Sequence, residues 1–267
     1  ALGVAVTIVE LADRIVPVVS AEASRKLAQS FEKRGIRVTT SSSVSAVTRS
    51  GETVTVTLAS GEELAASKAL ISIGRTAATD GLGLQDLGIR TEKGRVIVGE
   101  DLLTTAPGVY AIGDCVIGPQ LAHKASYDGL LAVDSILGSK RTADYSNIPT
   151  CVWTDPEIAC VGLSEEDAKA RIAGVRVAKF PFLASGKAFL AGAPEGYVKI
   201  IGDKNGAILG VEIMGADACE LIAEAALARS SGITVQQWAR VVHAHPTLSE
   251  ALQEAAQIFS GTPIHSL

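Results

Sequence analysis

His245 and Glu250 are the two side chains whose types and spacing most clearly indicate catalysis. They stand in the segment His-Ala-His-Pro-Thr-Leu-Ser-Glu, residues 243–250. Histidine is the side chain that exchanges protons near neutral pH. A carboxylate bonded to one ring nitrogen fixes the tautomer and stabilises the imidazolium, so the other nitrogen can exchange a proton. The segment therefore predicts that His245 is an acid/base group and that Glu250 is its orienting partner.

The same residues also match a purely structural pattern. Thr247 and Glu250 have the spacing of a capping box, in which each side chain satisfies a free backbone N–H at the start of a helix. A histidine that precedes such a helix is often structural. The local sequence leaves both interpretations open.

A second candidate site surrounds Asp114. An apolar run, residues 108–112, leads into Gly113-Asp114, and a helix is predicted over 123–137. Asp114 can accept a hydrogen bond from a polyol hydroxyl, and the helix start near Leu121–His123 offers free backbone N–H groups. The ribityl chain and ring edge of a flavin need such groups. The structural alternative for Asp114 is an Asx turn.

Two further residues end apolar runs that resemble strands of a parallel sheet. Glu10 closes the run 4–10, and an acid there in a dinucleotide-binding unit bonds the ribose hydroxyls and disfavours a 2′-phosphate. Gly74 closes the run 69–73. Gly74 fits either a turn that needs permissive dihedrals or backbone that approaches a ligand. Glu10 favours NAD over NADP.

The elements that must position these residues change character near Ile148. Before it, strands and helices alternate, and the apolar runs 4–10 and 69–73 are expected to be strands buried on both faces. After it, turn signals separate further strands, and helices follow, as in an α+β module. The other predicted elements are strands at 36–39, 44–48, 53–58, 95–98, 108–112, 197–201 and 207–213, and helices at 20–34, 216–230, 235–242 and 248–259.

Composition excludes several classes of protein. A length of 267 residues fits about two domains. The net charge of −5, with no basic stripe, makes nucleic acid an unexpected partner. No apolar run is long enough for a membrane span, and no signal peptide is visible. The chain opens on Ala1 without an initiator Met, so we expect its true amino terminus to lie upstream.

The four cysteines lack the close spacing of a metal or redox pair, and no metal site is predicted. Four reduced thiols in a cytoplasmic protein is the favoured interpretation, and a Cys151–Cys160 disulfide is the alternative.

A family resemblance rests on these motifs. The stretches Thr104–Asp114 and Gly118–Ala125 closely resemble the second FAD motif of the pyridine nucleotide-disulfide oxidoreductases, and the resemblance covers essentially the whole chain. It implies that FAD and NAD are the cofactors. Asp114 matches the residue that holds the ribityl chain. The resemblance implies that the flavin is lined by Gln120, Leu121, Ala122 and His123, and that NAD is contacted by Glu10, Val44 and Gly74.

His-Pro-Thr-x-x-Glu, from His245 to Glu250, resembles the interface-domain signature of this family's disulfide reductases. The resemblance implies that His245 exchanges protons with a dithiol substrate, and that the pair reaches across a homodimer. His243 matches no catalytic role, and the His245–Pro246 bond is a candidate for cis. The segment looks most like the dihydrolipoamide dehydrogenases, whereas glutathione reductases prefer NADP and mercuric reductases lack the His-Pro pair. Ala77-Ala78, where Pro-Asn is more usual, and Lys187, where Arg is common, depart from the family's pattern.

The resemblance implies an α/β chain: part of a Rossmann-like NAD domain (1–74), the second half of an FAD domain (75–147) and an α+β interface, or dimerisation, domain (148–267). It implies dihydrolipoamide on an acyltransferase subunit of a 2-oxo acid dehydrogenase complex as substrate and partner. The redox disulfide of the family is absent from the sequence, so this chain alone is expected to be inactive. A non-enzymatic dimerisation fragment and another disulfide reductase of the family are the alternatives.

Overall fold

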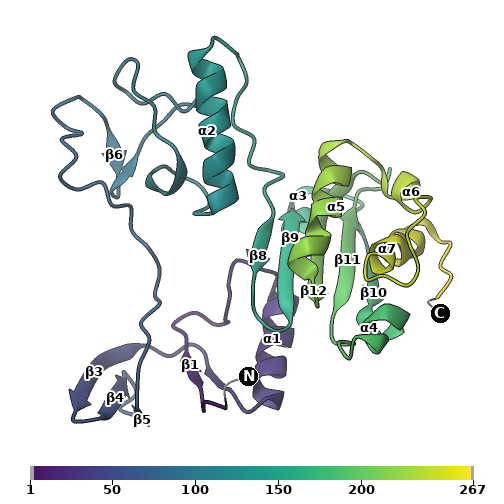
Figure 1. The fold of residues 1–267 in the computed structure, drawn as a ribbon, viewed down its shortest axis with the longest axis horizontal. Coiled ribbons are helices and arrows are strands. Elements are labelled where there is room, and N and C mark those ends of the chain that lie inside the picture. The colour runs from purple at the N-terminus through teal and green to yellow at the C-terminus, as the bar shows by residue number, and fades with distance from the viewer. Residues whose placement is uncertain (1–2, 266–267) are drawn as a thin grey trace. The chain divides into compact units, whose positions relative to one another are not determined.

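The computed structural model describes residues 3–265, and the chain divides into two compact units. Unit 1 combines the segments before Ile71 and after Ile148, and unit 2 spans Ile71–Ile148. Figure 1 labels their elements, and each unit is described by itself. No helix among residues 3–265 is both long and apolar enough to cross a membrane.

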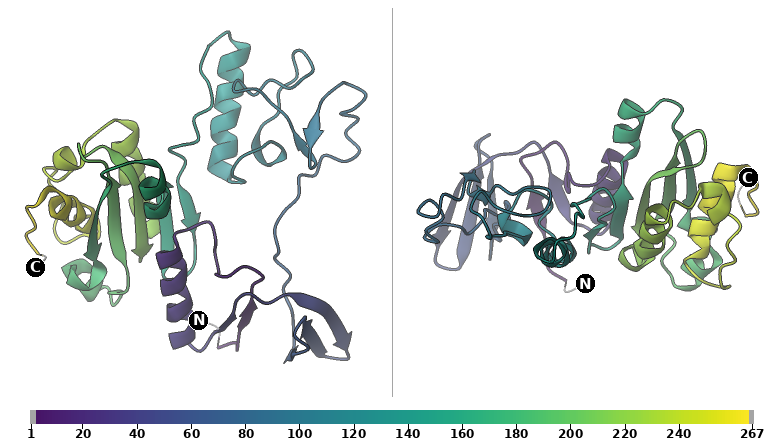
Figure 2. Two further views of the ribbon diagram at one scale, coloured as in Figure 1. Left: turned by 180° about the vertical axis from the view of Figure 1, so that it is seen from behind. Right: turned by 90° about the horizontal axis from the view of Figure 1, so that it is seen from above.

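Unit 1 is built on a five-stranded antiparallel sheet with the order β10-β11-β12-β9-β8. Helices cover both of its faces (Figure 2). The strands are β8 (Thr150–Val152), β9 (Glu157–Gly162), β10 (Arg176–Pro181), β11 (Tyr197–Gly202) and β12 (Ile208–Gly215). The helices of this part of the chain are α3 (Glu165–Arg171), α4 (Gly186–Leu190), α5 (Ala218–Ser230), α6 (Val235–Trp238) and α7 (Glu250–Ser260).

Alternation along the strands assigns side chains to the two faces of this sheet. Val198 and Ile200 of β11, with Val211 and Ile213 of β12, join the larger core, where α5 and α7 pack on the sheet. The residues between them point to the other face. This larger core also contains Trp238, which is 2% exposed.

Helix α1 (Ala21–Lys33) covers the opposite face, where Ala23 and Leu27 are fully buried against Tyr197 and other residues of the sheet. The hydroxyl of Ser20 caps its start by accepting from the amide of Ala23 at 3.1 Å. Gly35 follows its end with φ +79°, a left-handed value that favours glycine. The prediction of a helix over 20–34 is therefore confirmed.

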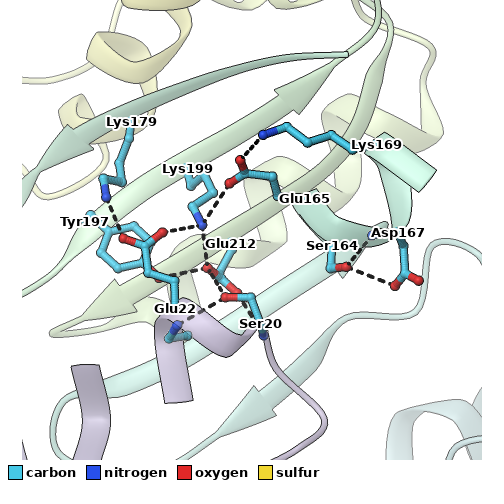
Figure 3. Close-up of polar contacts among 11 residues, drawn as sticks. Ser20, Glu22, Ser164, Glu165, Asp167, Lys169, Lys179, Tyr197, Lys199 and Glu212 are labelled. Carbon is cyan, nitrogen blue, oxygen red and sulfur yellow. Dashed lines mark hydrogen bonds and ion pairs between the residues drawn. The ribbon is translucent and has the colours of Figure 1, made fainter. Parts of the chain in front are cut away.

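A charged cluster lies between α1 and the sheet (Figure 3). Lys199, 3% exposed, bonds Glu22 of α1 at 2.5 Å and approaches Glu212 and Glu165 at 3.4 Å each. Glu212, 4% exposed, also accepts hydrogen bonds from the hydroxyls of Tyr197 at 2.7 Å and Ser20 at 2.9 Å. The buried carboxylate is therefore satisfied by a cation and two hydroxyls, as buried charges must be.

The amino-terminal part of unit 1 adds two small sheets. Strands β1 (Thr7–Val9) and β2 (Arg37–Thr39) pair in parallel. Strands β3 (Val44–Ser50), β4 (Thr53–Leu58) and β5 (Glu63–Ala66) form an antiparallel meander, which contains the strands predicted over 44–48 and 53–58.

The prediction that the run 4–10 is a strand buried on both faces is wrong. The strand has three residues, and Val4 and Val6 are 70% and 39% exposed. The reason is that this sheet has two strands, so β1 pairs along one edge.

Unit 2 contains one long helix, α2 (Ala122–Ile136), which confirms the helix predicted over 123–137. A short 3-10 helix, η1 (Gly113–Cys115), precedes it, and β6 (Thr91–Glu92) pairs with β7 (Arg95–Val96). Two small apolar clusters hold the unit together, one around Val96 and Val116 and one around Leu102 and Leu131.

Two predicted strands are corrected by the structure. Residues 69–73 form no strand in the described chain, and Leu70 and Ile73 are each 93% exposed. Residues 108–112 contribute one isolated bridge, Leu103 to Tyr110. Strand formation depends on a neighbour that accepts the backbone hydrogen bonds and covers the side chains. The apolar composition of these runs could not supply that neighbour.

The helices near the carboxyl end agree with prediction except over 235–242. Helix α6 ends at Trp238, because a turn bond from the amide of Val241 to the carbonyl of Trp238 replaces the helical pattern. Val242 is 91% exposed beyond it. Helix α7 begins at Glu250, two residues after the predicted start at Leu248.

Candidate active site

His245 and Glu250 form a hydrogen-bonded pair at the start of α7. Nδ1 of His245 lies 2.8 Å from Oε1 of Glu250, and the peptide bond between His245 and Pro246 is cis. The His245 side chain is 78% exposed and that of Glu250 is 26% exposed. Because Nδ1 faces a carboxylate acceptor, Nε2 is left for proton exchange with a substrate.

Glu250 serves the helix start and the histidine at once. Its Oε2 accepts a hydrogen bond from the amide of Thr247 at 2.7 Å. The hydroxyl of Thr247 donates to the carbonyl of Ala244 instead of capping α7, so half of the predicted capping box is present. One carboxylate therefore contacts both the helix start and the histidine, and the acid/base role stays a prediction.

The charge of Glu250 is stabilised by its neighbours. Burial alone would raise its pKa. The hydrogen bonds from Thr247 and His245 and the charges of His245 and His265 outweigh burial and lower the pKa of Glu250 below its ordinary value. The carboxylate is therefore ionised at neutral pH, as a partner that stabilises an imidazolium must be.

In unit 2, a buried ion pair fixes the Gly113–Asp114 turn. Lys124 and Asp128, both fully buried, lie one helical turn apart on α2 and bond at 2.6 Å. Asp128 accepts from the amide of Gly113 at 3.0 Å, and Lys124 donates to the Gly113 carbonyl at 3.3 Å. The turn that carries Asp114 is thus held through its backbone on both sides.

Asp114 and the start of α2 form an arrangement that fits a polyol and a polar ring edge. The Asp114 carboxylate is 47% exposed and lies 3.5 Å from a guanidinium nitrogen of Arg75. Leu121, directly before α2, makes no side-chain cap hydrogen bond. A Cβ at Gly118 would lie 3.3 Å from the Lys124 side chain, which favours glycine in this turn. The donors and acceptors fit a flavin.

Glu10 and Val44 lie near each other in unit 1. Glu10 follows β1, and its carboxylate accepts from the amide of Ala12 at 2.8 Å. Its carbonyl accepts from the amide of Ser42, so the segment that leads into Val44 runs beside Glu10. Glu10 thus stands at the carboxyl end of a parallel strand pair, the position expected for a ribose-binding acid.

The predicted site residues fall into three groups, which we describe separately. Glu10 and Val44 form one group and His245 with Glu250 another, both in unit 1. Unit 2 holds the third group: Gly74, with φ +124°, Asp114, Gln120, Leu121, Ala122 and His123. Among these, Gln120 donates to the Asp114 carbonyl at 3.5 Å.

The sequence interpretation missed Lys124, Asp128 and Tyr145. The hydroxyl of Tyr145 donates to Asp128 at 2.9 Å. The four-residue spacing of Lys124 and Asp128 was a visible signal of an ion pair on a helix, but such pairs usually lie on the surface. Nothing in the local sequence showed that this pair is buried.

Replacing Tyr145 with Phe should loosen the Gly113–Asp114 turn. The change removes a hydrogen bond to a charged acceptor, which is typically worth about 1.5–3 kcal/mol. Hydrogen exchange at the Gly113 amide should therefore become at least about tenfold faster. Tyr110→Phe, which removes a hydroxyl outside this network, is the control. Equal protection in the two variants would show that Tyr145 does not support the turn.

All four cysteines are free thiols in the structure. In the register of β8 and β9, Cys151 lies opposite Ala159 and Cys160 lies opposite Thr150, so the two thiols are not paired across the strands. The alternative of a Cys151–Cys160 disulfide is therefore wrong. No group of three or more potential metal ligands occurs within residues 3–265.

Comparisons with known proteins match nearly the whole chain. The family model described as pyridine nucleotide-disulphide oxidoreductase matches residues 1–129, and the dimerisation domain of the same family matches residues 148–256. The chain is 44% identical to the mitochondrial dihydrolipoyl dehydrogenase of Pisum sativum, over 99% of this chain and 54% of that protein. It is 39% identical to the dihydrolipoyl dehydrogenase of Bacillus subtilis, over 98% and 57%.

A solved structure gives the same result. LpdA from Mycobacterium tuberculosis superposes with a TM-score of 0.91 at 33% identity, over 96% of this chain and 57% of that one. The chain thus spans about half the length of the proteins that it matches. The mixed α/β fold with a dimerisation domain agrees with the fold class expected from the sequence.

Proposed function

The chain belongs to the pyridine nucleotide-disulphide oxidoreductase family, and from this premise we propose that it is the carboxy-terminal part of a flavin-dependent dihydrolipoyl dehydrogenase. In that role it oxidises dihydrolipoamide with NAD as the acceptor. The observation that carries the proposal is the His245–Glu250 hydrogen bond at the start of α7, inside the region that matches the dimerisation domain.

FAD and NAD are the cofactors of this proposal. FAD, which carries electrons between a dithiol and NAD, would be held by Asp114 and by the start of α2, from Gln120 to His123. The exposed Asp114 carboxylate, and the position of the other residues at the start of α2, support this assignment. NAD would be contacted by Glu10, Val44 and Gly74, and the place of Glu10 at the end of β1 supports it.

His245 is the proton carrier in this proposal. Nε2 takes the proton of a substrate thiol, because a thiolate and not a thiol reacts. Glu250 holds Nδ1 at 2.8 Å and stabilises the positive charge that the ring acquires. The proton leaves His245 to solvent, which reaches this exposed side chain.

The domains and partners follow the same proposal. Residues 1–74 are part of the NAD domain, 75–147 the end of the FAD domain and 148–267 the interface domain that forms a homodimer. The breaks between the compact units, after Leu70 and after Ile148, support these limits. The substrate arrives on an acyltransferase subunit of a 2-oxo acid dehydrogenase complex. Four free thiols suit a reducing compartment, and we propose the cytoplasm.

Residues 1–267 alone should not complete the reaction. The four cysteines are free, and no two of them have the Cys-x-x-x-x-Cys spacing of the family's redox pair. The decisive protein is therefore a chimera in which the amino-terminal part of the Bacillus subtilis dihydrolipoyl dehydrogenase is joined to residues 1–267.

The chimera should bind flavin, shown by its visible absorbance, and form NADH from dihydrolipoamide and NAD. The chain alone should form none. A flavin-loaded chimera that used only NADP, or that left dihydrolipoamide unreacted while it reduced another disulfide, would assign a different branch of the family. Flavin content measured beforehand separates a misfolded chimera from an inactive site.

A non-enzymatic dimerisation module is the second candidate, favoured by the match of 148–256 to a dimerisation domain and by the four free thiols. The mass of the chain in dilute solution tests it. A monomer excludes this candidate. A dimer of residues 1–267 that binds neither FAD nor NAD supports it.

Replacing Glu10 with Ala in the chimera should raise the KM for NAD. Loss of a charge-assisted hydrogen bond to the ribose costs about 1.5–3 kcal/mol, which corresponds to a factor of about 10 to 100. The KM for NADP should change little, so initial rates with both nucleotides give the discrimination directly. Glu32→Ala, at an exposed position of α1, is the matched control. An unchanged preference for NAD over NADP would show that Glu10 does not contact the nucleotide.

A further inference from the structure

A second His–Glu pair lies two residues before His245. Nε2 of His243 lies 2.7 Å from Oε1 of Glu224 on α5, and Nδ1 lies 3.1 Å from the carbonyl oxygen of Val241. The His243 side chain is 5% exposed, in contrast to the 78% of His245. This pair is therefore internal, and the proton exchange proposed for His245 does not use it.

Both ring nitrogens of His243 face acceptors. A backbone carbonyl only accepts, and Oε1 of Glu224 also accepts from Nε1 of Trp238 at 2.6 Å, which shows that this oxygen is an acceptor. The ring can satisfy both contacts only if each nitrogen carries a hydrogen, so His243 is an imidazolium.

The electrostatic surroundings of His243 agree with this protonation state. The hydrogen bond to Glu224 raises the pKa of His243; burial opposes the rise, while the charges of Glu224 and Glu250 and the bond to Val241 add to it. The charged groups around the ring are Glu224 from α5 and Glu250 from α7. His245 and His265 act on Glu250 in turn.

Hydrogen bonds connect the segment around His245 to two different helices. Glu224 ties His243 to α5, and Glu250 ties His245 to α7. Between them, the Thr247 hydroxyl bonds the Ala244 carbonyl at 2.7 Å. Val242, directly before His243, is 91% exposed and packs against little. The His243–Glu224 bond is thus the main side-chain anchor on the amino-terminal side of His245.

We propose that His243 is a positioning residue for His245: its doubly hydrogen-bonded ring anchors the segment 241–246 to α5, so that the His245 ring meets Glu250. The effect on catalysis rests on the proposed function, whereas the anchoring itself does not. Below its pKa the ring has two N–H donors and holds both acceptors. As pH rises through that raised pKa, one donor is lost and the anchor weakens.

The anchor can be tested on residues 1–267 by NMR of the imidazole rings. At neutral pH both nitrogens of His243 should be protonated, and Glu224→Gln should lower its titration midpoint by about one unit or more. The resonance of the His245 Nδ1 proton, hydrogen-bonded to Glu250, should broaden as pH rises through the His243 midpoint. In Glu224→Gln that broadening should move to lower pH together with the midpoint. His265→Gln, which removes a His–Glu pair outside this anchor, should move neither.

The catalytic consequence is measured in the chimera. His243→Gln should lower kcat about tenfold and leave the KM for dihydrolipoamide unchanged, because a displaced acid/base group slows the proton transfer without weakening substrate binding. A chimera that lacks dithiol activity, with the NMR result as expected, would overturn the proposed function and leave the anchor in place.

Two results would overturn the positioning role. One is a His243 ring with a single protonated nitrogen at neutral pH. The other is a His245 Nδ1 resonance that stays sharp at every pH and does not respond to Glu224→Gln. The titration of the unsubstituted chain provides this evidence even if the variants fold poorly.

Discussion

Replacing His245 with Gln in the chimera should lower kcat for dihydrolipoamide oxidation by about 10²–10⁴-fold, the range of general acid–base catalysis. His245 is 78% exposed, so the change removes no packing and should leave the fold intact. Oxidation of NADH by a one-electron acceptor such as ferricyanide involves no dithiol and should continue. The ratio of the two activities therefore isolates the loss of proton exchange from any loss of cofactor.

The matched control is His265→Gln. His265 is 67% exposed and bonds Glu254 at 2.6 Å, so its ring is exposed like that of His245, although the Glu254 side chain is only 9% exposed. The kcat of the His265→Gln chimera should stay within about twofold of the unsubstituted chimera, because His265 is not part of the proposed proton-transfer pair. If His245→Gln and His265→Gln had equal dithiol activity, the acid/base assignment would be wrong.

Local signals were sufficient for elements whose ends and faces are set by nearby residues. The helix predicted over 20–34 agrees with α1, because the Ser20 cap and the left-handed Gly35 act within one helical turn of its ends. The strands predicted over 44–48 and 53–58 agree with β3 and β4, which are joined by a turn at Gly51, where φ is positive. The strands predicted over 69–73 and 108–112 were wrong, because β-branched composition indicates a preference for extended backbone but does not supply the neighbouring strand that a sheet requires.

The polar contacts likewise fall into those between residues close in sequence, which could be predicted, and those between distant residues, which could not. The bond between His245 and Glu250 joins residues five apart, so the motif contained both partners. The charged cluster could not be predicted, because Ser20 and Glu212 bond across 192 residues of sequence. Lys199 appeared only as one polar residue within an apolar strand. The contact of His243 could not be predicted either, because its partner Glu224 lies on a different helix.

Replacing Lys199 with Met should destabilise unit 1 by about 3–5 kcal/mol, the cost of removing one partner from a buried ion pair. Glu212, 4% exposed, would keep its charge without a cation, with the hydroxyls of Tyr197 and Ser20 and the backbone amide of Ser20 as its donors. Urea denaturation followed by tryptophan fluorescence measures this, because both tryptophans of the chain, Trp153 and Trp238, belong to unit 1.

The same cluster should make unit 1 sensitive to acid. Burial alone would raise the pKa of Glu22, but hydrogen bonds and charges from Lys179 and Lys199 outweigh it and lower that pKa to about 2. A depressed pKa means that the contribution of Glu22 to the free energy of unfolding is fully present above its ordinary value of 4.5. It is lost as pH falls from there toward about 2. In Lys199→Met this acid-dependent loss should be smaller.

Lys179→Met is the control that separates the effect of removing a buried charge from the effect of removing any positive charge beside Glu22. Lys179 also bonds Glu22, at 2.6 Å, but its side chain is 41% exposed. Its loss should therefore cost about 1 kcal/mol or less. The double change Lys199→Met and Glu212→Gln should recover part of the stability, because it removes the unpaired charge together with its partner. Lys199→Met could instead lower the free energy of unfolding no more than Lys179→Met does. The cluster would then contribute no more than a surface pair, and packing of α1 on Tyr197 would hold the two segments of unit 1 together.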